Sequence, residues 1–463
     1  MSDLDSFLAT LTGTLAAAQT ELPGLHAWCV TRRTLASRQT LLLGQPGNDL
    51  AAYQDRTVAE TTYTWQVYAR QDHPAVMGTS VATVDPLRPL PTQLAATLAA
   101  ARLGRNPVWE LPPPPGIAYP EVLTADPAIL ADPGAEQARL LARLRCEAAA
   151  LDGVRVNSAE AYVNRRSLQA RWSTGIAVEK QASEVYVEIA AEPLPGPNRQ
   201  EVNPFMEAVG VDGLDLPGFF HHVAEATRAL GRTELPQTTE HAVVLIDAEA
   251  IATLLQELTG QFRAEAEYEQ RPCLLPGATV ASGPVAAEAD RLTLLVDPWL
   301  PAMAQSTAFT DEGLPTERAV MVEDGVVRRQ LVNTRFGQYL GRPANGITGN
   351  LVVPPGRWSR DDLLAAAPEV LEIITFSSLL VNPQTLSWSS EIKLGRLHRR
   401  GQPGVLIKGG LVSGNLRDNL RDSRFSNRLV TRNLLARAWY PAKGYYGPDL
   451  LLIQSGVKIA GVG

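Results

Sequence analysis

The sequence predicts an α+β protein in two parts: a helix and antiparallel-sheet domain over residues 1–235, and a mostly antiparallel β domain over residues 236–463. Helical and strand-like periodicities alternate as far as residue 190. A Pro/Gly/Asn-rich stretch at 192–204, a helix and a connector at 231–239 then lead into the second part. After Tyr268, short strand-like runs between Gly and Pro turns indicate a curved sheet or open barrel around one organising helix.

The N-terminal part begins with a helix, because leucines recur at helical spacing after Ser2. Thr92 is the expected N-cap of a second helix that ends before Gly104, and Pro112–Gly116 is an expected exposed linker. The predicted helices are 2–22, 92–103, 135–151 and 217–230. The predicted strands are 25–30 and 40–43 with a turn-rich gap between them, 63–69 with its hairpin partner 76–83, and 154–163, 169–174 and 184–190.

The C-terminal part alternates short strands with turns. Ser359 is the expected cap of a short helix that runs to Ala367, and the segment from Asn415 to Leu435 is expected to hold another helix. The predicted strands are 242–246, 292–296, 319–322, 326–332, 373–381, 405–409 and 450–461.

The organising helix lies within residues 246–270. Ala250, Leu254 and Leu258 recur at helical spacing, so one side of the helix is apolar and is expected to pack inward. Asp247 and Glu249 stand near its start, where the helix dipole favours negative charge.

This helix contains Gln256-Glu257-Leu258-Thr259-Gly260-Gln261. With His in place of Gln256 and Gln261, the segment would read HExxxH, which supplies two zinc ligands and a general base. Positions five apart diverge by about 140° on a helix, so sharing a metal requires a break, for which Gly260 is the cheapest place. A Gln carbonyl oxygen is a poor zinc ligand, and from the residues alone Gln256-Glu257 reads as a polar helix edge.

Other segments carry a family resemblance. The similar segments are Phe309-Thr310-Asp311-Glu312-Gly313-Leu314-Pro315-Thr316, Val322-Glu323-Asp324-Gly325-Val326, Thr348-Gly349-Asn350, Gly409 through Gly414-Asn415-Leu416, and Ser455 through Gly461. From about residue 240 to the end, their order and spacing resemble the TldD/PmbA family, whose PmbA-type members are also called TldE. In its TldD-like members HExxxH is the zinc site of a protease, with a cysteine near the C-terminus as a further ligand.

This chain departs from that site, because both histidine positions are Gln and no cysteine follows Cys273. The resemblance therefore implies the metal-free PmbA/TldE-type subunit of a peptidase that acts on unfolded peptides. We expect no catalytic residue, no cofactor and no metal ligand in this chain, with Gln256, Glu257 and Gln261 as the degenerate positions. Zinc is expected only in a TldD-like partner, and the chain is expected to pair with that partner or with itself as a dimer.

Composition and net charge narrow the functions and locations that are expected for this protein. The chain has 463 residues, a formal net charge of −7 and three cysteines without paired spacing. No apolar run reaches the roughly 18 residues of a membrane span, and the acidic start lacks the features of a signal peptide, so a cytoplasmic location without membrane contact is expected. The acidic balance argues against nucleic acid as a partner, although 393–443 holds twelve Lys or Arg and two acids. This basic segment either faces an acidic partner or pairs within the chain.

Two other functions stay open. A stand-alone hydrolase would need a titratable cluster with shifted pKa values, and a binding module would use the basic segment. Asp311 and Glu312 form the best carboxylate pair outside the helix, but in a turn they are expected to hold the backbone. His221, His222, His398 and Cys273 have no partner evident in the sequence. The sequence contains no GxSxG, GxGxxG, P-loop or CxxC motif.

Overall fold

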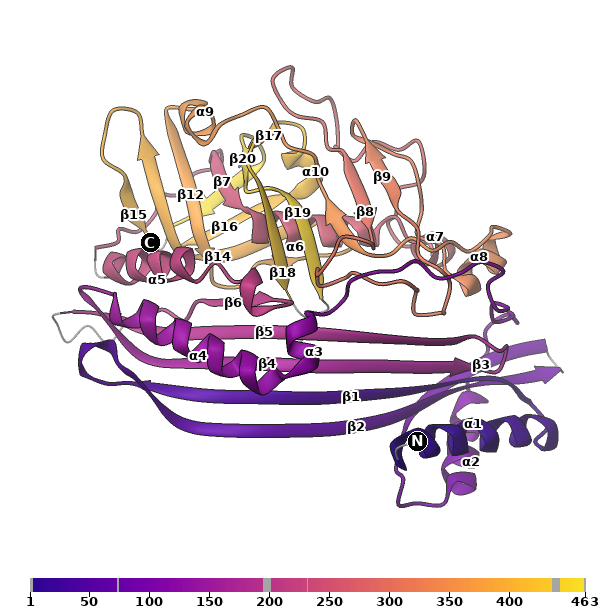
Figure 1. Ribbon diagram of the computed structural model, residues 1–463. Coiled ribbons are helices and arrows are strands. Elements are labelled where there is room, and N and C mark those ends of the chain that lie inside the picture. Colours follow the sequence, from indigo (N-terminus) through magenta and orange to yellow (C-terminus); the bar gives the residue numbers. More distant parts are fainter. Residues whose placement is uncertain (1–2, 73–74, 195–200, 231, 435–441, 462–463) are drawn as a thin grey trace.

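The computed structural model describes residues 3–72, 75–194, 201–230, 232–434 and 442–461. In Figure 1 the long strands of the N-terminal part cross the bottom of the molecule, and the C-terminal part stands above them. Both parts combine helices with sheets that are mostly antiparallel, so the predicted α+β class is confirmed. No helix among the described residues is long and apolar enough to cross a membrane.

The N-terminal sheet is antiparallel throughout and has the order β3-β2-β1-β4-β5-β6. Its strands are β1 (Leu25–Gly44), β2 (Leu50–Asp72), β3 (Ala75–Val84), β4 (Val154–Trp172), β5 (Ala177–Pro193) and β6 (Phe205–Ala208). The predicted gap at 31–39 is therefore wrong, as is the break at 164–168. Backbone pairing with a neighbour on each side keeps both polar runs extended, although neither shows a strand-like hydrophobic alternation.

Helices α1 (Asp3–Glu21) and α2 (Leu90–Ala101) pack on one end of this sheet, where Trp65, Leu11 and Leu98 belong to one buried cluster. The predicted helices are confirmed, but Thr92 is not the cap of α2. The N-cap is Pro89, and Pro91 occupies the first turn, where its missing N–H costs no helical hydrogen bond.

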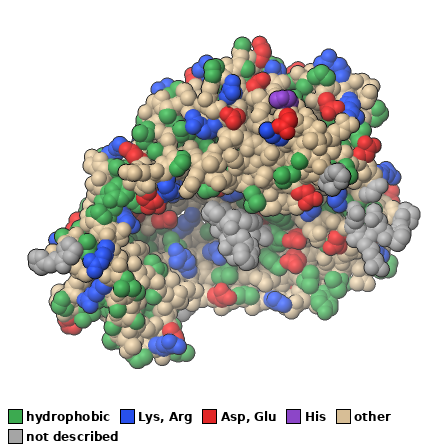
Figure 2. Space-filling model, turned by 180° about the vertical axis from the view of Figure 1, so that it is seen from behind, with side chains coloured by type: hydrophobic (Ala, Val, Ile, Leu, Met, Phe, Trp, Pro, Cys, Tyr) green, Lys and Arg blue, Asp and Glu red, His purple; other side chains and the backbone are tan. Residues whose placement is uncertain are grey.

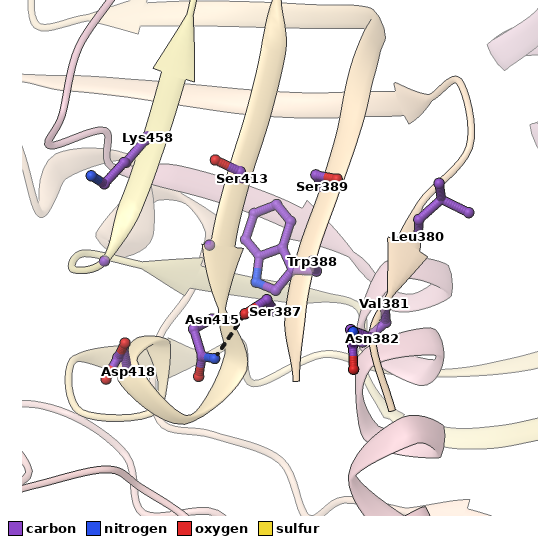
Figure 3. A pocket seen from close by; sticks show the side chains of 12 residues that line it. Leu380, Val381, Asn382, Ser387, Trp388, Ser389, Ser413, Asn415, Asp418 and Lys458 are labelled. Atoms are coloured by element: carbon purple, nitrogen blue, oxygen red, sulfur yellow. Dashed lines mark hydrogen bonds between the residues drawn. The ribbon is translucent and has the colours of Figure 1, made fainter. Parts of the chain in front are cut away.

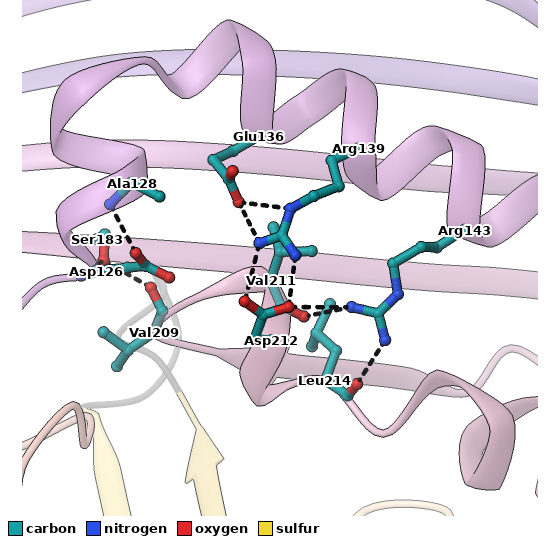
Figure 4. A network of polar contacts seen from close by, with 10 residues as sticks. All are labelled: Asp126, Ala128, Glu136, Arg139, Arg143, Ser183, Val209, Val211, Asp212 and Leu214. Carbon is teal, nitrogen blue, oxygen red and sulfur yellow. Dashed lines mark hydrogen bonds and ion pairs between the residues drawn. The ribbon is translucent and has the colours of Figure 1, made fainter.

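Towards the other end of the same strands lie α3 (Pro127–Ala131) and α4 (Pro133–Ala149), which contact β4, and α5 (Leu216–Ala229) packs against β5 and α4. A polar network joins α4 to the short 3-10 helix η2 (Val211–Gly213), as Figure 4 shows. Arg139 contacts both Glu136 and Asp212, and Arg143 donates to the carbonyl oxygen of Val211 at 2.9 Å. These bonds fix the chain segment that leads from β6 into α5.

The C-terminal part contains two sheets. One has the order β10-β9-β8-β11-β19-β18, and the other β17-β20-β7-β12-β14-β16-β21, with β13 and β15 also paired to β14. Their strands are β7 (Val244–Asp247), β8 (Leu294–Asp297), β9 (Ala319–Glu323), β10 (Val326–Val327), β11 (Asn350–Val352), β12 (Glu369–Phe376), β13 (Leu380–Val381), β14 (Ser387–Arg399), β15 (Val405–Ile407), β16 (Leu411–Asn415), β17 (Ser423–Phe425), β18 (Leu429–Leu434), β19 (Lys443–Pro448), β20 (Leu450–Ile453) and β21 (Val457–Ala460). Two pairs, β7–β12 and β11–β19, are parallel.

The segment 415–435, described as far as residue 434, holds the expected helix, but this helix is only one turn long. Only α10 (Leu416–Asn419) forms, with Asn415 as its N-cap, and β17 and β18 follow. Their pairing with β20 and β19 fixes them as strands, a contact with residues further along the chain that local helix propensity does not contain. Helix α9 (Arg360–Ala365) starts as predicted, with a capping box between Ser359 and Asp362.

The N-terminal and C-terminal parts pack against each other. The largest buried cluster draws its residues from 242–459, and a second cluster of N-terminal residues also takes in Leu394 of β14. Glu234 pairs with Ile407, and Thr239 pairs with Ile459, so the connector between the parts is bound to C-terminal strands. The division at residue 235 remains a prediction.

Candidate functional site

The organising helix is α6 (Ala248–Gly260), and it forms for local reasons. The side chain of Asp247 caps its start by accepting the N–H of Ala250 at 3.0 Å. Ile251, Leu254 and Leu258 are buried, as the apolar periodicity predicts. The packed face fixes the rotation of the helix and therefore the direction in which the degenerate motif points.

The motif ends where the helix ends. Gln261 is the C-cap residue, directly after Gly260, as the five-residue spacing requires. Its side chain is buried, and its Nε2 donates to the carbonyl oxygens of Gln384, at 2.8 Å, and Pro383, at 3.3 Å. The amide oxygen of Gln256 is also buried but has no hydrogen-bond partner within the described part of the chain. The two glutamines, equivalent in the motif, are thus used differently.

These residues do not fit a zinc ion. The motif offers amide groups in place of imidazoles, and Gln261 points its N–H groups, which cannot bind a cation, at backbone carbonyls. Among the described residues, no three His, Cys, Asp or Glu side chains form a group that could hold a metal. No step of a reaction is therefore assigned to a metal bound by Gln256, Glu257 or Gln261.

The polar face of α6 carries a different arrangement. Glu249, Thr253 and Glu257 recur every four residues and share this face. Lys443 of β19 reaches over it, with Nζ 3.3 Å from Oγ1 of Thr253. Burial lowers the pKa of Lys443, and the negative charges of Glu257 and Glu249 oppose that shift. An ammonium group thus lies beside the glutamate that would be the general base of HExxxH.

The start of α6 concentrates negative charge. Burial raises the pKa of Asp247, and burial together with the charge of Asp247 raises the pKa of Glu249 to about 7. Arg432 of β18 acts on both carboxylates in the opposite direction. Glu207 of β6 adds further negative potential at Glu249. The cluster therefore lies where β6 of the N-terminal part meets α6 and β18 of the C-terminal part.

The surface is hollowed between the two parts. Figure 2 shows this hollow from behind, with acidic and basic side chains around it. Glu249 is accessible to solvent, yet protein surrounds it closely enough to raise its pKa. Sequence reasoning missed Lys443 and Arg432 as site residues. Both belong to the basic segment, but only the fold brings them to α6.

A cavity of about 720 Å³ opens on the C-terminal sheet. Figure 3 shows polar side chains of β14, β16 and β21 around it, with Ser389, Ser413 and Lys458 in one row. A second row contains Asn415, which donates to Oγ of Ser387 at 3.3 Å and to the carbonyl oxygen of Thr385 at 2.7 Å. The cavity therefore offers mainly hydroxyl and amide groups. Its titratable lining residues, Asp418 and Lys458, are engaged elsewhere, Asp418 with the hydroxyl of Ser282 and Lys458 with Glu240 at 2.6 Å.

A second cavity, of about 590 Å³, lies between β5 and the loop at 306–309. Lys180 is one of its lining residues, and its Nζ donates to the carbonyl oxygen of Ser306 at 2.6 Å. Burial lowers the pKa of this lysine to about 8. The sequence carried no signal for Lys180, because only contact between the two parts removes it from solvent.

The other residues selected from the sequence have structural or surface positions. Glu312 accepts the N–H and the hydroxyl of Thr334, as expected of a carboxylate that holds a turn. His398 pairs with Glu372 at 2.8 Å, and His221 lies near Glu225 at 3.8 Å. Burial raises the pKa of the Cys273 thiol, which disfavours the thiolate.

The basic segment does not form one surface. Arg399 pairs with Glu369, Arg428 lies 3.7 Å from Asp449, and Arg424 stacks on a tryptophan ring. Arg437 lies outside the described residues. Because its charges are spread over several elements and partly paired within the chain, the segment gives little support to a binding module for acidic partners.

The C-terminal part of this chain is similar to a domain of known proteins. Residues 239–461 match the PmbA/TldA metallopeptidase C-terminal domain, which includes α6 and all the C-terminal strands. By this match, residues 239–461 are a C-terminal domain of the TldD/PmbA family. A curated relative from Archaeoglobus fulgidus, named a metalloprotease, is 25% identical over 285 residues. That match covers 58% of this chain and 64% of the relative, so it spans less than two thirds of that protein's length.

Solved structures of family members share the whole fold. TldE from Thermococcus kodakarensis matches with a TM-score of 0.74 at 15% identity, over 97% of this chain and 100% of that one. A protein from Bacteroides thetaiotaomicron, described as a modulator of DNA gyrase, matches with a TM-score of 0.75 at 18% identity over 100% of both chains. At such identities the likeness shows the fold alone.

Proposed function

We propose that this chain is the zinc-free, non-catalytic subunit of a TldD/TldE-type peptidase. The observation that carries the proposal is the donor set on α6: Gln256 and Gln261 stand where the family's ligands would be, and the Gln261 side chain is bound to backbone carbonyls. In this proposal the amine of Lys443, which interacts with the charge of Glu257, takes the place of a metal beside it. In this proposal the chain forms a wall of the reaction chamber, and a TldD-like partner carries the zinc and the catalytic glutamate.

The role in the complex is to admit and hold an unfolded peptide. The hollow between the two parts has charged side chains around it, and the C-terminal cavity adds hydroxyl and amide groups next to the short strand β13. An extended peptide satisfies such groups through its backbone and therefore without strong sequence preference. The cytoplasmic location belongs to the same proposal.

The first test is the zinc content of the purified chain after dialysis. We expect a ratio near zero for the chain alone and about one zinc per complex after mixing with the TldD-like chain of the same organism. Cleavage of an unfolded peptide is expected only for the mixture. One zinc per isolated chain, together with peptidase activity of that chain, would contradict the proposal.

A second candidate function has one observation in its favour. Glu249, with its pKa near 7, lies by Lys443 and on the same helix face as Glu257, and such a cluster can serve a hydrolase that uses no metal. This function predicts peptide hydrolysis by the isolated chain in the presence of a chelator, abolished by Glu257→Gln. Activity that persists in Glu257→Gln would exclude Glu257 as its base.

A further inference from the structure

The cavity of about 590 Å³ beside β5, named the β5 cavity, has a mainly basic set of charged groups. Among the described residues that line it, the cations are Arg32 of β1, Arg165 of β4 and Lys180 of β5. Glu179 is the one carboxylate among these lining residues. The charges of the lining therefore favour an anion in the cavity.

The carboxylate of this lining is already hydrogen-bonded within the sheet. Arg32 lies opposite Gln169, and Gln169 lies opposite Glu179, so the three side chains form one row across β1, β4 and β5. Arg32 donates to the amide oxygen of Gln169 at 3.1 Å, and the amide nitrogen of Gln169 donates to Glu179 at 3.4 Å. This row joins one cation of the lining to its carboxylate and leaves Arg165 and Lys180 outside it.

Both remaining cations keep donors that the described part of the chain does not use. The ammonium group of Lys180 donates once, to the carbonyl oxygen of Ser306 at 2.6 Å, and has two more N–H groups. Arg165 donates to the carbonyl oxygen of Leu130 at 3.0 Å and has no ion-pair partner among the described residues. The charge of Asp311 acts on Lys180, but no hydrogen bond joins these two side chains.

The rest of the β5 cavity is largely apolar. The rings of Tyr119 and Phe309 meet edge to face, with their centroids 6.1 Å apart, and Val122, Leu168 and Val178 add aliphatic groups. A volume of this size, with apolar walls and a few charged groups, is typical of a site for a small organic molecule.

We propose that the β5 cavity binds a small organic anion, whose carboxylate or phosphate group contacts Lys180 and whose apolar body lies against Tyr119 and Phe309. Arg165 adds positive potential from the β4 side of the cavity. Lys180 is half-buried, so its attraction to an anion is screened less by water than that of an exposed lysine. Burial also lowers the pKa of Lys180, and a bound anion opposes that shift by stabilising the ammonium form.

The inference does not rest on the proposed function, because no residue of α6 lines the β5 cavity. A zinc-bearing, active chain would leave the anion site standing. A β5 cavity that binds no anion would leave the zinc-free proposal standing.

The test is isothermal titration calorimetry of the full chain with two anionic probes, benzoate and phenyl phosphate. We expect saturable binding of at least one of them, with a Kd of about 1 mM or below, and the tighter probe identifies the acidic group. Benzamide has nearly the shape of benzoate without its charge and is expected to bind at least about tenfold more weakly than benzoate.

Variants locate the bound anion. Lys180→Met removes the contacting charge and is expected to raise the Kd about tenfold, whereas Arg165→Ala removes an exposed charge and is expected to raise it about threefold. Arg88→Ala is the control, because Arg88 is exposed and pairs with Asp85 outside the cavity, and its Kd is expected to equal that of the wild type. Circular dichroism checks that each variant is folded.

A pH series separates a contacting lysine from a merely structural one. The pKa of Lys180 is lowered to about 8, so benzoate, whose own charge stays constant, is expected to bind the wild type about tenfold more weakly at pH 9 than at pH 7. Lys180→Arg keeps its charge over this range and is expected to bind with an almost constant Kd. Arg165→Ala is expected to keep the pH dependence of the wild type.

Three results would overturn the proposal. The first is the absence of saturable binding for both anions at about ten times the expected Kd. The second is benzamide binding as tight as that of benzoate, which would mean that the cavity selects the ring and not the charge. The third is a wild-type Kd that does not change between pH 7 and pH 9, and this result decides the question even if Lys180→Met fails to fold.

Discussion

Two of the segments that carry the family resemblance, 309–316 and 256–261, use their polar groups in different ways. In 309–316 Glu312 accepts two hydrogen bonds from Thr334, and the Thr310 hydroxyl accepts the N–H groups of Glu312 and Leu314. The carbonyl of Gly313 accepts the hydroxyl of Tyr119 at 2.7 Å, which ties the turn to the N-terminal part. In 256–261 the amide oxygen of Gln256 is buried without a partner among the described residues, and charged groups with shifted pKa values lie on the same helix.

Burying a polar group without a hydrogen-bond partner lowers the stability of the folded state. The position of the Gln256 amide on α6 is therefore not explained by the stability of the fold. Glu312 shows what a structural carboxylate looks like in this molecule, since its hydrogen bonds connect a turn to the start of a helix. One family segment, 309–316, therefore stabilises the fold, whereas 256–261 only marks the position of a former or shared site.

The largest effect is expected in the architectural segment. Gly313 has φ of +78°, and a Cβ there would lie 2.6 Å from Ile176 and 3.4 Å from Trp172. Gly313→Ala therefore combines backbone strain with overpacking, and we expect a loss of about 2–4 kcal/mol in the free energy of unfolding. Urea denaturation measures this loss.

Gly325→Ala is the matched control, because Gly325 has φ of +77° and open space around its Cβ position. It is expected to lose about 1–2 kcal/mol, the backbone contribution alone. Equal losses in the two variants would show that the contact with Ile176 and Trp172 contributes nothing.

The next effect separates the two glutamines of α6. Gln261→Met removes both hydrogen bonds to the loop at 383–384, and we expect a loss of about 1–3 kcal/mol. Gln256→Met removes an acceptor that has no partner in the described part of the chain, so the free energy of unfolding is expected to stay level or to rise by about 1 kcal/mol. Thermal and urea unfolding of the pair measure the difference. A loss in Gln256→Met as large as that in Gln261→Met would mean that both amides are equally engaged.

The third effect is a pH dependence. The pKa of Glu249 in the folded chain is raised from 4.5 to about 7, so the folded state holds this proton more tightly than the unfolded state. Its stabilising contribution is complete below pH 4.5 and is lost as the pH rises through 7. Glu249→Gln, which stays neutral, should therefore lose less stability over this window, with a slope difference of up to about one proton.

Glu257→Gln serves as the comparison, because it changes a charge on the same helix face one position from the orphan amide of Gln256. Unfolding free energies at several pH values between 4 and 8 measure the slopes. Wild-type and Glu249→Gln curves that run parallel would show that Glu249 titrates at an ordinary pH and that the negative cluster is well solvated.

The sequence by itself determined the elements whose stabilising contacts are local. α6 starts at Ala248 because Asp247 caps it, and α9 starts at Arg360 because Ser359 and Asp362 form a capping box. The apolar stripe of α6 and the alternation of Tyr63, Trp65 and Val67 identified their buried faces, since periodicity in the chain is periodicity in space. The degenerate motif and the family resemblance could also be recognised in the sequence, because both depend on residue type and spacing alone.

Only the tertiary structure decided what depends on distant partners. β1 stays extended through a polar run because β2 and β4 pair with it, and the residues after α10 become strands because β19 and β20 accept them. Lys443 stands beside Glu257 because β19 crosses α6. Hydrogen bonding between strands and the removal of charges from water arise between residues far apart in the chain, so no local pattern of the sequence records them.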